Sequence, residues 1–138
     1  MKSISLILIY LLFFSTLLFA NEFRDIKLIK LKKDEQKKIL VKYDEKGKLF
    51  KFRWTLYKNG GLVIFRSYDR VVAQNILYLR NKNRSFMFNL KPKGARFYNV
   101  PYVLVKFKEF NYETGEALFE LFLSDKNKQI NFKYLEEG

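Results

Sequence analysis

Within residues 49–58 of this chain of 138 residues, apolar and polar side chains alternate from Phe50 to Leu56. A period of two residues predicts a β-strand that is buried on one face only. The buried side would carry Phe50, Phe52, Trp54 and Leu56, and the exposed side Lys51, Arg53 and Thr55. Asn59, Gly60 and Gly61 follow at once, and such residues accept the positive φ angles of a tight hairpin turn. The sequence therefore predicts a hairpin whose second strand starts at Leu62.

The same rhythm of short apolar runs and turn-forming residues continues through most of the chain. Further strands are predicted at residues 37–43, 62–68, 85–90, 103–110, 117–124 and 129–135. Turn signals recur about every dozen residues, a spacing typical of antiparallel all-β domains. We predict an all-β fold, an antiparallel meander of about eight strands that forms a small barrel or a sandwich.

Two stretches fit this rhythm less well. Residues 70–80 can form a strand, or a helix that begins at Asp69 as its N-terminal cap, and the strand is favoured. Residues 26–31 follow neither the strand period nor the helix period. The charged residues 32–38 are predicted to form a loop or a single helical turn.

Residues 1–20 have the layout of an export signal. Lys2 precedes an apolar run, and a short tail ends in the small residue Ala20, as in a secretory signal peptide. We therefore expect a signal peptide at residues 1–20 and one domain at residues 21–138, located in the periplasm or secreted. Leu18 is larger than the residue that a cleavage site prefers at that position. The alternative is an uncleaved segment that anchors the domain in the inner membrane.

Histidine and cysteine are absent from the chain. Their absence removes Ser-His-Asp and Cys-His nucleophiles, the usual zinc sites, disulfides and lipid attachment through cysteine. No serine after residue 20 starts a Ser-x-x-Lys motif, and no glycine loop has phosphate-binding spacing. Most acidic residues, among them Asp44, Glu113 and Asp125, fall in predicted turns. We therefore expect a protein that is not an enzyme and that holds no cofactor and no metal ion.

The formal net charge is +13, from 27 Lys and Arg against 14 Asp and Glu. Such a charge favours anionic partners: lipid head groups, lipopolysaccharide, acidic proteins or nucleic acid. A composition rich in Lys, Asn, Ile and Phe also arises from AT-rich coding without selection for binding. Nucleic acid is disfavoured, because neighbouring side chains of a strand point to opposite faces, so Phe52 and Lys51 would not contact one ligand together.

Two groups of cations are candidates for contact with an anionic partner. The first group lies in predicted strands, with Lys51 and Arg53 in one strand and Lys106 and Lys108 in another. The second group lies in a loop with Pro92 and Gly94 and consists of Lys91, Lys93 and Arg96. The four strand residues would form one basic face if their strands are neighbours. The three loop residues would form a small anion-binding rim, shaped by the backbone constraints of proline and the freedom of glycine.

These observations predict a periplasmic or secreted binding domain that contacts a protein or an anionic envelope component through a basic surface. The alternative is a carrier that holds an apolar or lipid-like ligand inside a small barrel, since residues 117–124 are apolar on both faces. An outer-membrane barrel is disfavoured, because among the predicted strands only residues 49–58 clearly reach the roughly 9–11 residues that a spanning strand needs. Membrane anchoring would come only from an uncleaved N-terminal segment, and the oligomeric state is left open.

Overall fold

The computed structural model describes residues 23–43, 45–80, 82–90 and 100–135. All regular structure in these ranges is β-strand, so the all-β prediction is confirmed there, and no helix capable of crossing a membrane occurs among them. The predicted export signal, at residues 1–20, lies outside the described residues. The strands are β1 (Asp25–Leu31), β2 (Lys37–Tyr43), β3 (Lys46–Lys58), β4 (Gly61–Tyr68), β5 (Val71–Tyr78), β6 (Ser85–Asn89), β7 (Tyr102–Asn111), β8 (Glu116–Ser124) and β9 (Ile130–Leu135).

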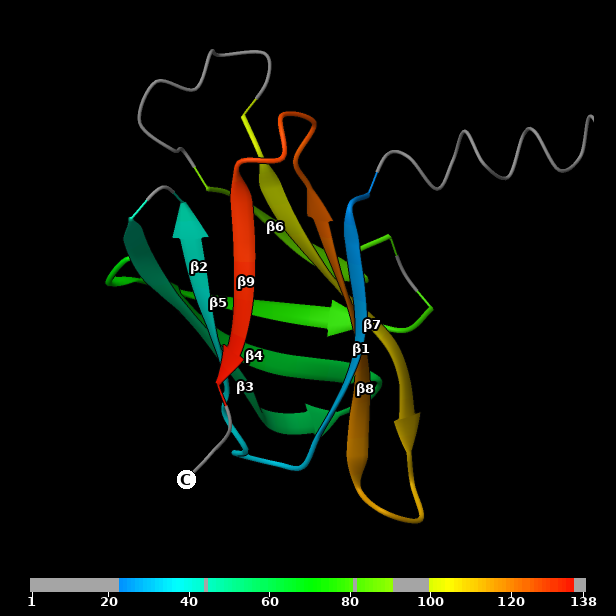
Figure 1. The fold of residues 1–138 in the computed structure, drawn as a ribbon. Helices are drawn as coiled ribbons and strands as arrows, with labels where there is room; N and C mark the ends of the chain where they lie inside the picture. The colour runs from blue at the N-terminus through cyan, green and yellow to red at the C-terminus, as the bar shows by residue number, and fades with distance from the viewer. Residues whose placement is uncertain (1–22, 44, 81, 91–99, 136–138) are drawn as a thin grey trace, which may run out of the picture.

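The strands form two antiparallel sheets that pack against each other (Figure 1). Sheet A has the strand order β1-β8-β7-β6, and sheet B has the order β5-β4-β3-β2-β9. In Figure 1, β4 and β5 run roughly across the direction of β1 and β8. The sheets do not close into a barrel. Of the two predicted architectures, the structure therefore has the sandwich.

The chain is not one continuous meander. Strands β2 to β5 and strands β6 to β8 are consecutive within their sheets, but both terminal strands change sheets. β1 pairs with β8 in sheet A, and β9 pairs with β2 in sheet B. Each sheet is therefore completed by a strand from the far end of the chain, a pairing that the alternation of side chains does not specify.

Tight turns with positive φ connect β3 to β4 and β4 to β5. Asn59 and Gly60 have φ of 55° and 77°, which confirms the predicted hairpin between β3 and β4. Asp69 and Arg70 have φ of 49° and 68° and join β4 to β5. Positive φ at both central residues matches the right-handed twist of the paired strands. Asp69 is thus a turn residue, not a helix cap, and residues 71–78 form the favoured strand.

Aromatic side chains fill the space between the two sheets. Phe50 and Phe52 of β3 are fully buried and stack with their ring centroids 5.4 Å apart. The ring of Phe52 also meets Phe119 of β8 edge to face at 5.4 Å and Phe86 of β6 at 6.3 Å. Edge-to-face contacts of this kind stabilise a core beyond the area that they bury. Phe52 therefore lies at the centre of the contact between sheets A and B.

Two β-bulges break the predicted alternation. The register of β3 shifts between Trp54 and Leu56, and that of β7 shifts just after Phe107. An extra residue in one strand moves every later side chain to the other face. Leu56 consequently points outward and is 48% exposed, so its predicted place on the buried side is wrong. Tyr57 instead turns inward and stacks on Phe110 with a centroid distance of 4.1 Å.

Strand β1 explains why residues 26–31 show no clear period. Ile29 and Leu31 are buried between the sheets, while Ile26 and Leu28 are about half exposed on the outer face of sheet A, at 54% and 55%. The strand is therefore apolar on both faces. A strand of this kind loses the alternation by which strands are recognised in a sequence.

Polar contacts join the terminal strands to the opposite sheet. The indole N–H of Trp54 donates to the carbonyl of Leu31 at 2.8 Å. Arg24 donates to the carboxylate of Asp125 at 2.9 Å and to the carbonyl of Ile130 at 2.7 Å. The same carboxylate accepts the amide of Ile130 at 2.7 Å, and the side chain of Asp125 is only 1% exposed. Asp125, predicted as a turn residue, thus also connects the start of β1 to the start of β9.

The bulge in β3 predicts that two neighbouring substitutions change the free energy of unfolding by very different amounts. Leu56→Ala removes an exposed side chain, and we expect it to change the free energy of unfolding by no more than about 0.5 kcal/mol. Tyr57→Ala removes an aromatic ring packed on Phe107 and Phe110, and we expect a loss of about 2 kcal/mol or more. Urea unfolding measures both. A larger loss for Leu56→Ala would mean that the alternation continues without a bulge.

The buried carboxylate of Asp125 predicts a second contrast. Asp125→Ala leaves the Ile130 amide and the Arg24 guanidinium without their partner, and we expect a loss of about 2–4 kcal/mol in the free energy of unfolding. Lys108→Ala breaks the exposed pair with Glu120, whose atoms are 3.9 Å apart, and should cost at most about 1 kcal/mol. Equal losses in thermal unfolding would refute the anchoring role of Asp125.

Candidate functional site

The two sheets differ sharply in charge. The five strands of sheet B contain ten Lys or Arg residues and no Asp or Glu. The four strands of sheet A contain four Lys and four acidic residues. The positive charge of the strands is therefore concentrated in one sheet.

Five cations on the outer face of β2, β3 and β9 lie close together and form what we call the basic face. They alternate with buried residues of β2, β3 and β9, and their register places them side by side. Lys38 lies directly opposite Lys51, and Lys133 lies opposite Leu40 on the same outer face. The basic face consists of Lys38, Lys42, Lys51, Arg53 and Lys133.

No carboxylate among the described residues forms an ion pair with the basic face. The three ion pairs found there are Arg24 with Asp125, Lys48 with Asp69, and Lys108 with Glu120. Like charges directly opposite each other in a sheet repel and destabilise it, so Lys38 and Lys51 carry a repulsion that a bound anion would relieve. On sheet A, by contrast, Lys106 lies opposite Glu120.

The candidate residues from the sequence do not come together as one surface. Lys51 and Arg53 lie on β3 in sheet B, whereas Lys106 and Lys108 lie on β7 in sheet A. Their strands are not neighbours, and the two outer faces of a sandwich look in opposite directions. The hypothesis of one face shared by these four residues is therefore not met. The loop cations Lys91, Lys93 and Arg96 lie outside the described residues.

Sequence reasoning missed Lys38, Lys42 and Lys133, which complete the basic face. Each lies in a predicted strand, and each alternates with buried side chains. One signal could have indicated the charged sheet: apart from Asp69 in its turn, residues 46–78 contain no acidic residue, and they form β3, β4 and β5. Only the pairing of β9 with β2 adds the third strand of cations.

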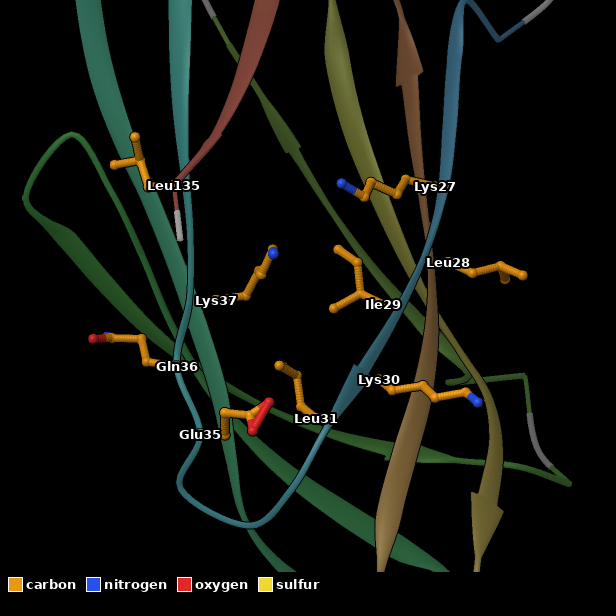
Figure 2. A pocket seen from close by; sticks show the side chains of 9 residues that line it. All are labelled: Lys27, Leu28, Ile29, Lys30, Leu31, Glu35, Gln36, Lys37 and Leu135. Atoms are coloured by element: carbon orange, nitrogen blue, oxygen red, sulfur yellow. The ribbon is translucent and has the colours of Figure 1, made fainter. Parts of the chain in front are cut away.

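A cleft of about 410 Å³ opens between β1 of sheet A and the start of β2 in sheet B (Figure 2). Lys27 and Lys37 extend into it from opposite sides, whereas Lys30 points away. The ammonium groups of Lys27 and Lys37 lie 3.6 Å and 5.8 Å from the centroid of the Tyr134 ring. Both cations therefore contact an aromatic face, which is a favourable arrangement in itself. Glu35 also lines the cleft, so its charge is partly balanced.

Tyr134, which contacts both of these lysines, keeps its proton at ordinary pH. Burial, followed by the neighbouring Asp25 carboxylate, raises the pKa of Tyr134. The hydroxyl donates to that carboxylate at 3.5 Å. The ring thus stays neutral at ordinary pH and serves as a platform for the two lysines.

A second pocket of about 480 Å³ lies at the opposite open side of the sandwich, between β4, β5 and β6. Arg66 faces it from the inner side of sheet B, with its guanidinium carbon 4.8 Å from the Phe86 centroid, and its Nε donates to Asn75 at 2.7 Å. Burial lowers the pKa of Arg66 and, with the nearby Asp69 carboxylate, raises the pKa of Tyr68 to about 12. Aromatic contact and one amide oxygen thus account for the orientation of this arginine.

The described residues contain no cluster of three or more acidic side chains able to hold a metal ion. Each cleft presents lysine or arginine against aromatic rings. Because the basic face carries more charge with less compensation, we take it as the candidate functional site.

The raised pKa of Tyr68 predicts a loss of stability at alkaline pH. Its folded-state pKa of about 12 exceeds the usual value of 10.0, so the neutral hydroxyl stabilises the folded state fully below pH 10 and the contribution disappears as the pH rises to about 12. Absorbance of tyrosinate should show a late phase near pH 12, and Tyr68→Phe should reduce its amplitude. An unchanged late phase would show that Tyr68 is not the group that titrates there.

No protein-family model, curated protein or solved structure matches the chain. Its function is accordingly inferred from the surface of the molecule itself.

Proposed function

We propose that this protein is a non-enzymatic, exported binding domain that attaches to an anionic component of the cell envelope through the basic face of sheet B. The partner carries phosphate groups, as lipid head groups and lipopolysaccharide do. One observation carries the proposal: five strands with ten cations contain no acidic residue. An envelope location agrees with the export signal expected at residues 1–20.

The geometry of the basic face suits a broad anionic surface better than a small ligand. Its cations are spread over β2, β3 and β9 and project from a sheet, so they do not converge on one point. Adjacent strands lie about 4.8 Å apart, which is shorter than the Debye length of about 8 Å at physiological salt. The cations therefore act together on an anionic surface. Lysine suits this role, since its ammonium group is a mobile point charge on a flexible stem.

Charge reversal on one sheet at a time tests the proposal. The triple variant Lys38→Glu, Lys51→Glu, Arg53→Glu alters the basic face, and the matched control Lys30→Glu, Lys106→Glu, Lys108→Glu changes the net charge equally on sheet A. Circular dichroism checks that each variant is folded. All proteins carry the same N-terminal segment, so its own affinity for membranes cancels.

Binding is measured on phosphatidylglycerol vesicles and on lipopolysaccharide over a range of salt. Each surface cation contributes about 1 kcal/mol near an anionic membrane, so the sheet B variant should lose on the order of 100-fold in affinity. The control should lose several-fold at most. Wild-type affinity should fall as salt rises. Equal losses for the two variants on both surfaces, or affinity indifferent to salt, would refute the proposal.

A further inference from the structure

The outer face of sheet B has a second region next to the basic face, which we call the apolar half. It covers β4, β5 and the end of β3. Cross-strand pairs place Ile76 opposite Val63, and Val63 opposite Leu56. We define the apolar half by Leu56, Val63, Phe65, Val72 and Ile76; the polar residues Gln74 and Lys58 lie beside them on the same outer face.

Four of these side chains are exposed to solvent, and Val63 is partly buried. Val72 is 72% exposed, Leu56 48% and Ile76 46%. Leu56 belongs to this region only because of the bulge in β3, which turns it outward. Strand β5 is an edge strand and contains no charged residue. A patch of aliphatic side chains of this kind on a soluble protein marks a surface for contact.

The apolar half and the basic face belong to one continuous surface. Phe65 lies opposite Arg53, whose guanidinium carbon is 5.9 Å from the centroid of the Phe65 ring. In the next row of the sheet, Val72, Ser67 and Lys51 follow one another across three strands. Sheet B thus presents an amphipathic outer face, with lysines over β2 and β9 and aliphatic side chains over β4 and β5.

Resting on the proposed function, we infer that this face docks on a bilayer of anionic phospholipid. The basic face contacts the phosphates, and the apolar half enters the boundary between head groups and acyl chains. Membrane-surface binding of this kind combines buried apolar area with attraction to anionic lipid. A fluid phospholipid bilayer is the anionic surface that supplies both of these contacts.

The composition of the face favours a bilayer over an acidic protein. Lysine is depleted in protein interfaces, whereas tyrosine, tryptophan and arginine are enriched there. Four of the five cations of the basic face are lysines, and four of the five members of the apolar half are aliphatic. Long lysine stems suit a membrane boundary, because they lie along apolar surface while the ammonium group stays in water.

Sheet A provides an internal comparison. Its outer face also exposes apolar side chains, with Ile26 at 54%, Leu28 at 55% and Met87 at 53%. Its strands, however, carry as many acids as cations, and Glu120 lies between Lys106 and Leu28 in the same row. This face exposes apolar side chains but lacks the excess of cations, so it should not approach an anionic bilayer.

A fluorescent probe placed on either face tests the inference. The chain contains no cysteine, so one introduced thiol can be labelled selectively with an environment-sensitive dye. Gln74→Cys lies opposite Phe65, within the apolar half, and Met87→Cys lies on the outer face of sheet A. With phosphatidylglycerol vesicles, we expect the label at residue 74 to shift to the blue and the label at residue 87 to stay unchanged. Phosphatidylcholine vesicles should shift neither label.

Matched substitutions separate the inference from the proposed function. Leu56→Thr, Val72→Thr and Ile76→Thr together keep β-propensity and replace three of the five side chains of the apolar half. Ile26→Thr, Leu28→Thr and Met87→Thr make the matched change on sheet A. At high salt, where attraction between charges is screened, we expect the first variant to bind vesicles at least tenfold more weakly than wild type. The second variant should bind as wild type does.

Two results would overturn the inference. If the label at residue 74 does not shift while binding still needs the basic face, the protein touches anionic surfaces without entering a bilayer, and only the proposed function stands. If that label shifts with protein concentration in the absence of vesicles, a second copy of the chain covers the apolar half instead.

Discussion

The aromatic layer between the two sheets is the contact on which the rest of the structure depends. Phe50 and Phe52 from sheet B and Phe107 and Phe119 from sheet A are fully buried in it. With no disulfide available, packing of this layer carries the stability of the sandwich. Because buried side chains occupy the inner positions of β2 and β3, the lysines that alternate with them, Lys38, Lys42 and Lys51, face outward. The basic face is thus a consequence of how the core is built.

Much of the fold could be predicted from local patterns. Alternation located β3, and Asn59 with Gly60 located its turn, because both signals act over a few residues. The bulge after Trp54 could not be predicted in this way, since one extra residue leaves the composition unchanged while it reverses the faces of Leu56 and Tyr57. The exchange of β1 and β9 between the sheets depends on long-range packing and on the contact of Arg24 with Asp125, which no local pattern encodes.

The sequence predicted that the candidate site is a basic surface, but it did not predict which residues form that surface. The excess of cations predicted a basic surface, and Lys51 and Arg53 do lie on it. Lys106 shares their alternating pattern, yet a strand pattern does not say which sheet the strand joins. Lys38 and Lys133 become members only through the pairing of β2 with both β3 and β9. Charge segregation between sheets is therefore a property of the topology as much as of the composition.

The outer face of sheet B carries both cations and exposed aliphatic side chains, and the most direct test of the proposed membrane docking is to map which residues the bilayer contacts. Backbone amide signals can be followed by solution NMR while bicelles containing phosphatidylglycerol are added. We predict changes at outward-facing positions of β2, β3, β4, β5 and β9, with β1, β7 and β8 unaffected. Changes confined to sheet A, or to the cleft between β1 and the start of β2, would contradict membrane docking through sheet B.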